Sequence, residues 1–232
     1  GKGMGQAPIW YADTEWAQEI FIPQVEEYLT SVREKYSNPY LTIRRINQKI
    51  QPSNLTEDDL WARATELLDS KQTLSALEIY NYLVFNSEMP YKSCLARYNR
   101  AIALEKLLMY DEAIGSYKRT LYEYDQLDEE NKPKVERLNF DCYKKLARVY
   151  LVMKEYSVSY SLWKKVFYKE SDISQKCTAL YNMMCVCKEA EAWDNLKEVL
   201  ETYDDLNTKE FADEVARFKK FLNAKLAMLS VK

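Results

Sequence analysis

Glycine is almost absent from this 232-residue chain beyond its first five residues. Three of the four glycines are Gly1, Gly3 and Gly5, and the fourth is Gly115. Tight turns and phosphate-binding loops that need a positive φ depend largely on glycine. No proline follows Pro133, so the later part of the chain also lacks the residue that breaks helices most strongly. These two absences predict an all-α fold.

A pattern of residue sizes recurs along the middle of the chain. In its clearest copy a small residue, Ala101, is followed by a second small residue, Ala113, and then by a large aromatic, Tyr117. The same frame gives the anchor pairs 64/76, 101/113, 147/159 and 184/196, and the last pair has the bulkier Met184 and Leu196. Successive pairs are offset by 37, 46 and 37 residues. Such periodicity indicates a repeat protein.

This pattern resembles the tetratricopeptide repeat, in which two small residues let antiparallel helices approach and an aromatic fills the gap to the next repeat. The resemblance implies an α-solenoid of about four helix pairs. The expected pairs span residues 57–88, 91–124, 137–170 and 174–203. The offsets exceed the family period of about 34 residues. Another type of solenoid with a less regular helix-pair period is therefore an alternative. So is a helical bundle whose alanines match the repeat by chance. The largest excess falls on the polar segment 125–134.

The two ends of the chain depart from the repeat. Residues 1–12 are expected to be a flexible N-terminal remnant left by cloning. Residues 13–52 are expected to form a helical segment that either caps the array or docks a partner. Asn207 and Glu210 resemble a capping box, and an apolar stripe follows them. We therefore expect a C-terminal capping helix over 207–230, which covers the last repeat.

The chain offers little that supports catalysis. It has no histidine, which removes the usual general base and the commonest transition-metal ligand. It also lacks a glycine-rich phosphate loop, a nucleophile elbow and a zinc signature. Five cysteines without CxxC spacing are expected to be reduced thiols, mostly buried. We therefore expect no enzyme, no cofactor and no metal site.

Charge and hydropathy limit the possible surroundings of the protein. The formal net charge is −3, so no bulk basic excess favours nucleic acid or an anionic membrane. No apolar run approaches the roughly 18 residues that span a bilayer, and we expect no membrane insertion. The reduced thiols, together with the lack of a recognisable signal peptide, favour an intracellular location, cytoplasmic in preference to nuclear.

The family resemblance also implies a binding surface. In tetratricopeptide proteins a concave groove is lined by the outward face of the first helix of each repeat. The corresponding residues here are Trp61, Thr65, Tyr98, Asn99, Ile102, Lys144, Arg148, Tyr181, Asn182 and Cys185. The family often uses asparagine at the place of Asn99 and Asn182 to bind a peptide backbone. The alternative is that these two amides are solvated or bonded within their own repeat.

The best-known ligand of the family is the C-terminal carboxylate of heat-shock chaperones, and this chain does not match its clamp. The clamp's first lysine and asparagine fall on Trp61 and Thr65, and its later lysine falls on Asp141, although Asn99 and Lys145 do match. We expect instead a protein partner that presents an amphipathic helix or extended segment with apolar and acidic residues. Such a segment would suit a groove with aromatic ends and a basic centre.

These observations predict a non-catalytic scaffold, acting as a subunit or adaptor of a multiprotein complex. One alternative is a structural subunit that is embedded in a large assembly through its N-terminal segment or convex face. The other is a helical repeat associated with nucleic acid. The basic charge for such binding would come from scattered pairs, which are Arg44-Arg45, Lys144-Lys145 and Lys164-Lys165.

Overall fold

The computed structural model describes residues 55–229. The expectations for residues 1–12 and 13–52 lie outside this range. The chain divides into two compact units, and the boundary falls between Asn86 and Ser87.

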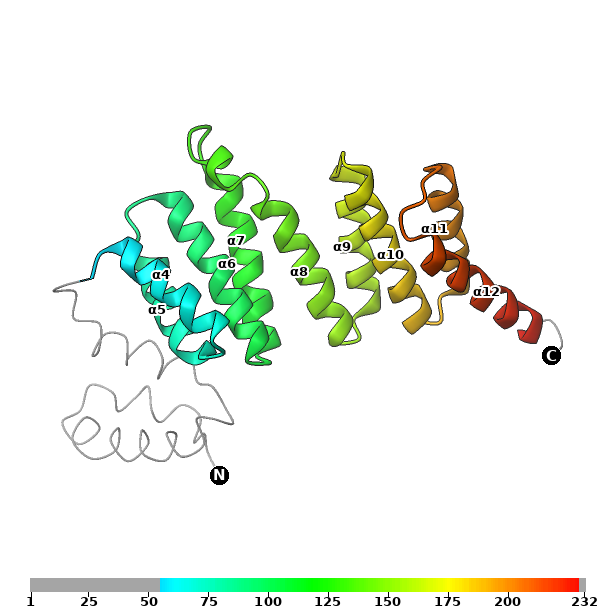
Figure 1. Cartoon of the computed structure of the whole chain (residues 1–232), viewed down its shortest axis with the longest axis horizontal. Helices are drawn as coiled ribbons and strands as arrows, with labels where there is room; N and C mark the ends of the chain where they lie inside the picture. Colours follow the sequence, from blue (N-terminus) through cyan, green and yellow to red (C-terminus); the bar gives the residue numbers. More distant parts are fainter. Residues whose placement is uncertain (1–54, 230–232) are drawn as a thin grey trace, which may run out of the picture. The chain divides into compact units, whose positions relative to one another are not determined.

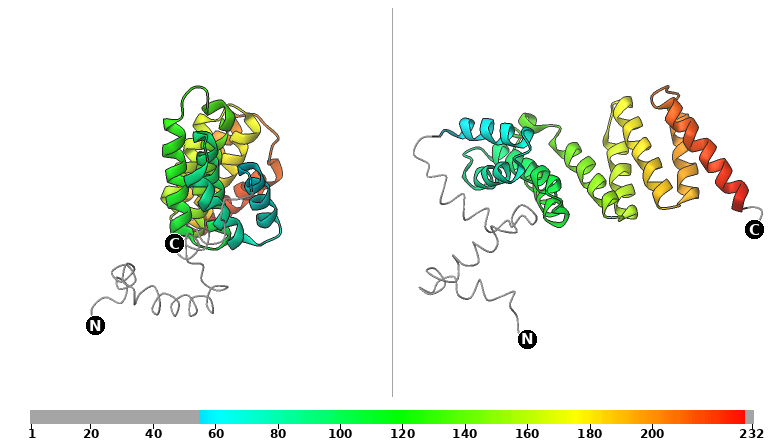
Figure 2. Two further views of the ribbon diagram at one scale, coloured as in Figure 1. Left: turned by 90° about the vertical axis from the view of Figure 1, so that its left-hand side faces the viewer. Right: turned by 60° about the horizontal axis from the view of Figure 1, so that its bottom comes forward.

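The described residues are helical, and no strand occurs among them. The first unit contains the pair α4 (Glu57–Asp69) and α5 (Thr73–Asn86). The second contains α6 (Pro90–Lys106), α7 (Tyr110–Gln126), the 3₁₀ helix η2 (Lys132–Val135), α8 (Leu138–Val152), α9 (Tyr156–Lys169), α10 (Ile173–Glu189), α11 (Trp193–Asp205) and α12 (Ala212–Leu229). Figures 1 and 2 show α8 to α11 side by side in chain order, with α12 as the last layer of this unit. The predicted all-α arrangement of helix pairs is confirmed.

The anchor residues of the repeat are completely buried in all four pairs. Their relative exposure is 0% at Ala64, Ala76, Ala101, Ala113, Ala147, Ser159, Met184 and Leu196. Ser159 is the polar member of this set, and its hydroxyl donates to the carbonyl oxygen of Ala147, its partner anchor, at 2.7 Å. This bond satisfies a hydroxyl that would otherwise be costly to bury. Small anchors therefore sit where the two helices of a pair meet.

The residue four positions after the second anchor is buried as well. It is Tyr80, Tyr117 or Trp163 in the first three pairs, each at most 2% exposed. In the fourth pair the equivalent residue is Leu200, which is smaller.

The turn inside each helix pair has the same backbone conformation every time. The residues at its centre have φ values between 54° and 63°, and they are Lys71, Leu108, Lys154 and Glu191. In the third pair the next residue, Glu155, donates its N–H to the carbonyl of Tyr150 at 2.8 Å, and the other pairs have the equivalent bond. This is the Schellman motif, in which glycine is the usual central residue. The four residues are 37, 46 and 37 positions apart, so the backbone follows the same frame as the anchors.

The extra residues between the second and third pairs form the connection between α7 and α8. Leu127 and Val135 are buried in it, each 8% exposed. The Asp128 carboxylate accepts from both the backbone and the side-chain nitrogen of Asn131, each at 2.8 Å. The connection is therefore folded onto the second unit.

The last helix begins later than the sequence suggests. Asn207 does not cap it, because its φ of 48° places it in the turn that ends α11. The hydroxyl of Tyr203 donates to the carbonyl of Glu210, and the hydroxyl of Thr208 accepts from the Glu210 N–H at 3.1 Å. Phe211 then has φ 57°, and α12 starts after it. The predicted capping box is wrong because the Tyr203 hydroxyl holds residues 207–211 in a turn.

A glycine at the centre of one turn should stabilise the protein. For Lys154→Gly we expect a gain of about 0.5–1 kcal/mol, because glycine removes the steric cost of the left-handed conformation at a modest entropic cost. Lys220→Gly, at an exposed position inside α12, is the matched control and should cost about 1 kcal/mol. Urea unfolding followed by circular dichroism measures both. A loss of stability with Lys154→Gly would contradict this account of the turn.

Enlarging an anchor should be destabilising. Ala147→Leu adds three carbons at a position with no exposed surface, so we expect a loss of about 1–3 kcal/mol. Ala216→Leu places the same side chain at an exposed position of α12 and should change stability little. The midpoint of thermal unfolding reports the difference. Equal effects of the two substitutions would mean that the anchors do not determine how closely the helices approach.

Candidate functional site

The residues predicted to line a groove are divided between the two units. Trp61 and Thr65 belong to the first unit, and the other eight belong to the second, on α6, α8 and α10. In the first unit the indole of Trp61 meets the ring of Tyr80 edge-on at 5.9 Å, and its N–H donates to Glu57 at 3.4 Å. The hydroxyl of Thr65 donates to the carbonyl of Trp61 at 3.0 Å. A single surface formed by Trp61 and Thr65 together with the eight residues of the second unit therefore remains a prediction.

On α6 the three predicted residues are half-buried. The ring of Tyr98 lies 5.8 Å from that of the buried Tyr117, whose hydroxyl donates to Glu105 at 2.8 Å. Burial raises the pKa of Tyr98, with a further contribution from the charge of Asp141 on α8. Tyr98 is therefore a neutral phenol that links the packed interior to the surface, and Asn99 and Ile102 flank it.

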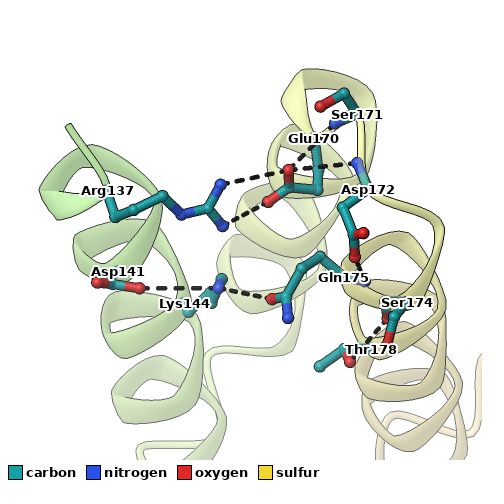
Figure 3. A network of polar contacts seen from close by, with 9 residues as sticks. All are labelled: Arg137, Asp141, Lys144, Glu170, Ser171, Asp172, Ser174, Gln175 and Thr178. Atoms are coloured by element: carbon teal, nitrogen blue, oxygen red, sulfur yellow. Dashed lines mark hydrogen bonds and ion pairs between the residues drawn. The ribbon is translucent and has the colours of Figure 1, made fainter.

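The two predicted residues of α8 differ in how they are engaged. Lys144 donates to the side chain of Gln175 on α10 at 2.9 Å and forms an ion pair with Asp141 at 3.7 Å (Figure 3). Arg148 is exposed, and no carboxylate in residues 55–229 pairs with it. Lys144 thus joins two first helices of neighbouring pairs, while the Arg148 guanidinium remains available to a ligand.

An ion pair beside these residues holds the open end of the third helix pair together. Arg137 precedes α8, Glu170 follows α9, and their side chains meet in a bidentate contact of 2.8 and 3.4 Å (Figure 3). The Glu170 carboxylate also accepts from the N–H of Ser171 at 3.1 Å. Hydrogen bonding to Arg137 lowers the pKa of Glu170. The carboxylate therefore fixes the start of α10 as well as the third pair.

On α10 the amide of Asn182 is already committed within the helix. Its nitrogen donates to the carbonyl of Thr178 at 2.7 Å, which is the alternative that the sequence left open for this residue. Tyr181 stacks on Phe211 at 5.2 Å with an interplanar angle of 13°, and Cys185 is half-buried close to it. The start of α12 therefore packs against part of the predicted surface.

A hollow of about 330 Å³ lies between α10 and α12. The lining residues are Tyr181, Lys188, Glu214, Arg217, Phe218 and Phe221. Phe218 meets Tyr181 edge-on at 6.0 Å, and the ammonium of Lys188 lies 5.2 Å from the ring of Phe221. Aromatic rings therefore form the walls, and two cations and one carboxylate lie among them. Only Tyr181 was predicted, because the sequence assigned α12 to sealing the array and not to binding.

The thiols and the acidic groups of residues 55–229 were the remaining candidates for a reactive or metal-binding site. All five cysteines are free, and all but the half-buried Cys185 are buried. Burial raises the pKa of Cys94 and of Cys187 to about 12, so both are protonated and unreactive at neutral pH. Within residues 55–229 no group of three His, Cys, Asp or Glu residues is placed to hold a metal ion. None of the described helices is both long and apolar enough to cross a membrane.

No protein-family description and no curated protein matches the sequence. Among solved structures the chain is similar to BtubC (BKLC) from P. vanneervenii, with 14% identity and a TM-score of 0.53 over 94% of this chain and 87% of that one. A structure of putative kinesin light chain nearly identical TPR-like repeats from Podosopora anserina has 14% identity and a TM-score of 0.48, over 73% of this chain and 95% of that one. The likeness to BtubC is one of fold. The tetratricopeptide-like helical-repeat arrangement is confirmed.

The pairing of Glu170 with Arg137 should make stability depend on pH. The pKa of Glu170 is lower in the folded protein than the value of about 4.3 in the unfolded chain. At pH values above 4.3 the ionised carboxylate therefore stabilises the fold. That stabilisation is lost as the pH falls through the folded-state pKa. Glu170→Gln should cost about 1–2 kcal/mol at neutral pH and much less in acid. Urea unfolding at both pH values measures this. The exposed Glu129→Gln is the control, and an equal pH dependence in both variants would rule out the pair as its source.

Proposed function

We propose that this chain is a non-catalytic, intracellular protein-interaction scaffold whose second unit binds a segment of a partner protein. The binding surface is the outward face of α6, α8 and α10, continued by α12. The observation that carries the proposal is the aromatic hollow between α10 and α12, which includes Tyr181 from the predicted groove. Pockets with apolar walls and a few charged groups are typical of ligand sites.

The charges of this surface favour a partner with acidic and apolar residues. Lys188 and Arg217 line the hollow beside a single carboxylate, Glu214, and Arg148 on α8 is a further exposed cation. A bulky apolar side chain of the partner would enter between the rings. Its acidic neighbours would meet the cations, as arginine and aromatic residues do at protein-binding hot spots. A partner of this kind is either an amphipathic helix or an extended segment.

The same surface is poorly suited to a chaperone carboxylate. Asp141 occupies the place of the clamp lysine and lies 3.7 Å from Lys144, where it offsets the charge of that ammonium. A terminal carboxylate at this point would meet a like charge. We therefore propose an internal segment of the partner as the ligand, not its C-terminus.

A second candidate function is that of a structural subunit in a larger assembly. It is favoured by exposed apolar residues at the turn ends of two helix pairs in the second unit. Leu108 is 70% and Val152 58% exposed, and Met153 lies beside Val152. Single exposed apolar residues need no explanation, but several along successive turns are typical of protein contacts. In this function the turn edge, and not the first-helix face, would carry the interaction.

Charge reversal on the proposed surface tests the first function. Peptides selected on the native chain from a random display library should contain an aromatic or other bulky apolar residue beside acidic ones. Their affinity should fall by at least about tenfold in Arg148→Glu/Arg217→Glu, because two attractive contacts become repulsive. Lys154→Glu/Lys197→Glu changes the net charge equally at other exposed positions and should leave the affinity unchanged. Equal losses in both double variants, or none in the first, would sink the proposed surface.

A further inference from the structure

The second helices of the repeats in the second unit differ sharply in charge. α7 has two basic and four acidic residues, and α11 has one basic and five acidic residues. α9 lies between them in the chain and has three lysines and no acidic residue. In a protein with a net charge of −3, α9 is therefore a local positive surface between two negative helices. Its charge does not follow from packing, because the lysines are not core residues.

Three lysines of this region are held over aromatic rings. The ammonium groups of Lys165 and Lys169 lie 4.3 and 5.5 Å from the ring centre of Tyr143, and that of Lys176 lies 5.4 Å from that of Phe167. Tyr168 lies beside Phe167, with ring centres 5.2 Å apart, and is 71% exposed. We call Lys165, Lys169 and Tyr168 of α9, together with Lys176 near the start of α10, the α9 lysine face.

These lysines have no acidic partner in the part of the chain that the structure describes. Other cations do, such as Arg97 with Glu123 at 2.9 Å and Lys219 with Asp204 at 2.7 Å. The rings order the lysine stems but leave their charge uncompensated. Because the side chains are already ordered, a bound anion would cost less side-chain entropy than it would at free lysines.

We propose that the α9 lysine face binds a short acidic segment of a partner protein, independently of the first-helix surface. The length of the segment follows from the length of α9, and its width is limited by the charges of the neighbouring helices. α9 has 14 residues and is about 21 Å long, which an extended segment of about six or seven residues would cover. A polyanion wide enough to reach sideways onto α11 would be repelled by its exposed Asp194, Glu198 and Glu201. Tyr168 adds an aromatic contact of the kind found at protein interfaces.

The same argument disfavours nucleic acid and membranes as ligands. A duplex or a lipid surface presents negative charge over many nanometres, so it would meet α7 and α11 together with α9. The positive surface of α9 suits a ligand whose negative charge is confined to that helix. A short acidic stretch flanked by neutral residues meets that condition.

The test uses the full chain and a fluorescent oligo-glutamate peptide of about seven residues. Lys165→Gln/Lys169→Gln/Lys176→Gln removes the charge while it keeps the side-chain stems, and we expect about tenfold weaker binding. Lys106→Gln/Lys209→Gln/Lys220→Gln makes the same charge change at exposed positions elsewhere and should bind as the native chain does. Fluorescence anisotropy at low salt measures affinity, and circular dichroism checks that both variants are folded. The native complex should weaken as salt is added.

Three results would overturn the proposal. Equal losses in the two triple variants would mean that only net charge matters. Tighter, α9-dependent binding of a single-stranded thymidine oligonucleotide, or of phosphatidylserine vesicles, would assign the face to that polyanion instead. Self-association of the native chain in sedimentation experiments, abolished by the α9 variant alone, would assign it to a second copy. Each result can be obtained whatever the first-helix surface binds.

Discussion

Everything in the second unit depends on how closely paired helices approach at their small anchors. Ala101, Ala113, Ala147 and Ser159 have no exposed surface, and the Ser159 hydroxyl bonds to the Ala147 carbonyl. With so little side-chain volume between the helices, the next aromatic residue, Tyr117 or Trp163, is buried and at most 2% exposed. The core that results runs from α8 to α12 without interruption.

This packing is strong enough to impose a backbone conformation that the local sequence does not favour. Four turns place lysine, leucine or glutamate in the left-handed region, where a residue other than glycine costs about 1–2 kcal/mol. The turns form nevertheless, because the paired helices on either side fix where the chain must reverse. Tertiary contacts thus replace the local signal that glycine usually provides.

Both proposed binding surfaces depend on the same stacking. One face of the second unit gathers residues from successive first helices, and Lys144 and Gln175 join two of them directly. Successive second helices carry charges of alternating sign. Two lysines of α9 rest on a ring of α8, and Lys176 of α10 rests on a ring of α9. A repeat architecture can present two chemically distinct surfaces because each helix of a pair faces a different side.

Sequence predicted part of the site and missed part of it for a physical reason. The family resemblance implies that Tyr98, Arg148 and Tyr181 lie on the outward faces of first helices, and this assignment needs only the register within each repeat. It does not include Phe218 and Phe221, because the apolar side chains of a capping helix are expected to cover the last repeat and not to line a binding surface. It also could not show that Asn182 bonds to Thr178, which depends on a side-chain rotamer.

By itself, the sequence determined the all-α fold, the spacing of the repeat and the burial of its anchors. These follow from which residues are small, apolar or absent, and such patterns are local or recur at fixed intervals. Only the tertiary structure decided that residues 207–211 form a turn instead of a helix start, because the hydroxyl of Tyr203 holds that segment from α11. It likewise decided the hollow between α10 and α12 and the ring-supported lysines of α9. These depend on contacts between helices, and the linear order of residues does not specify their geometry.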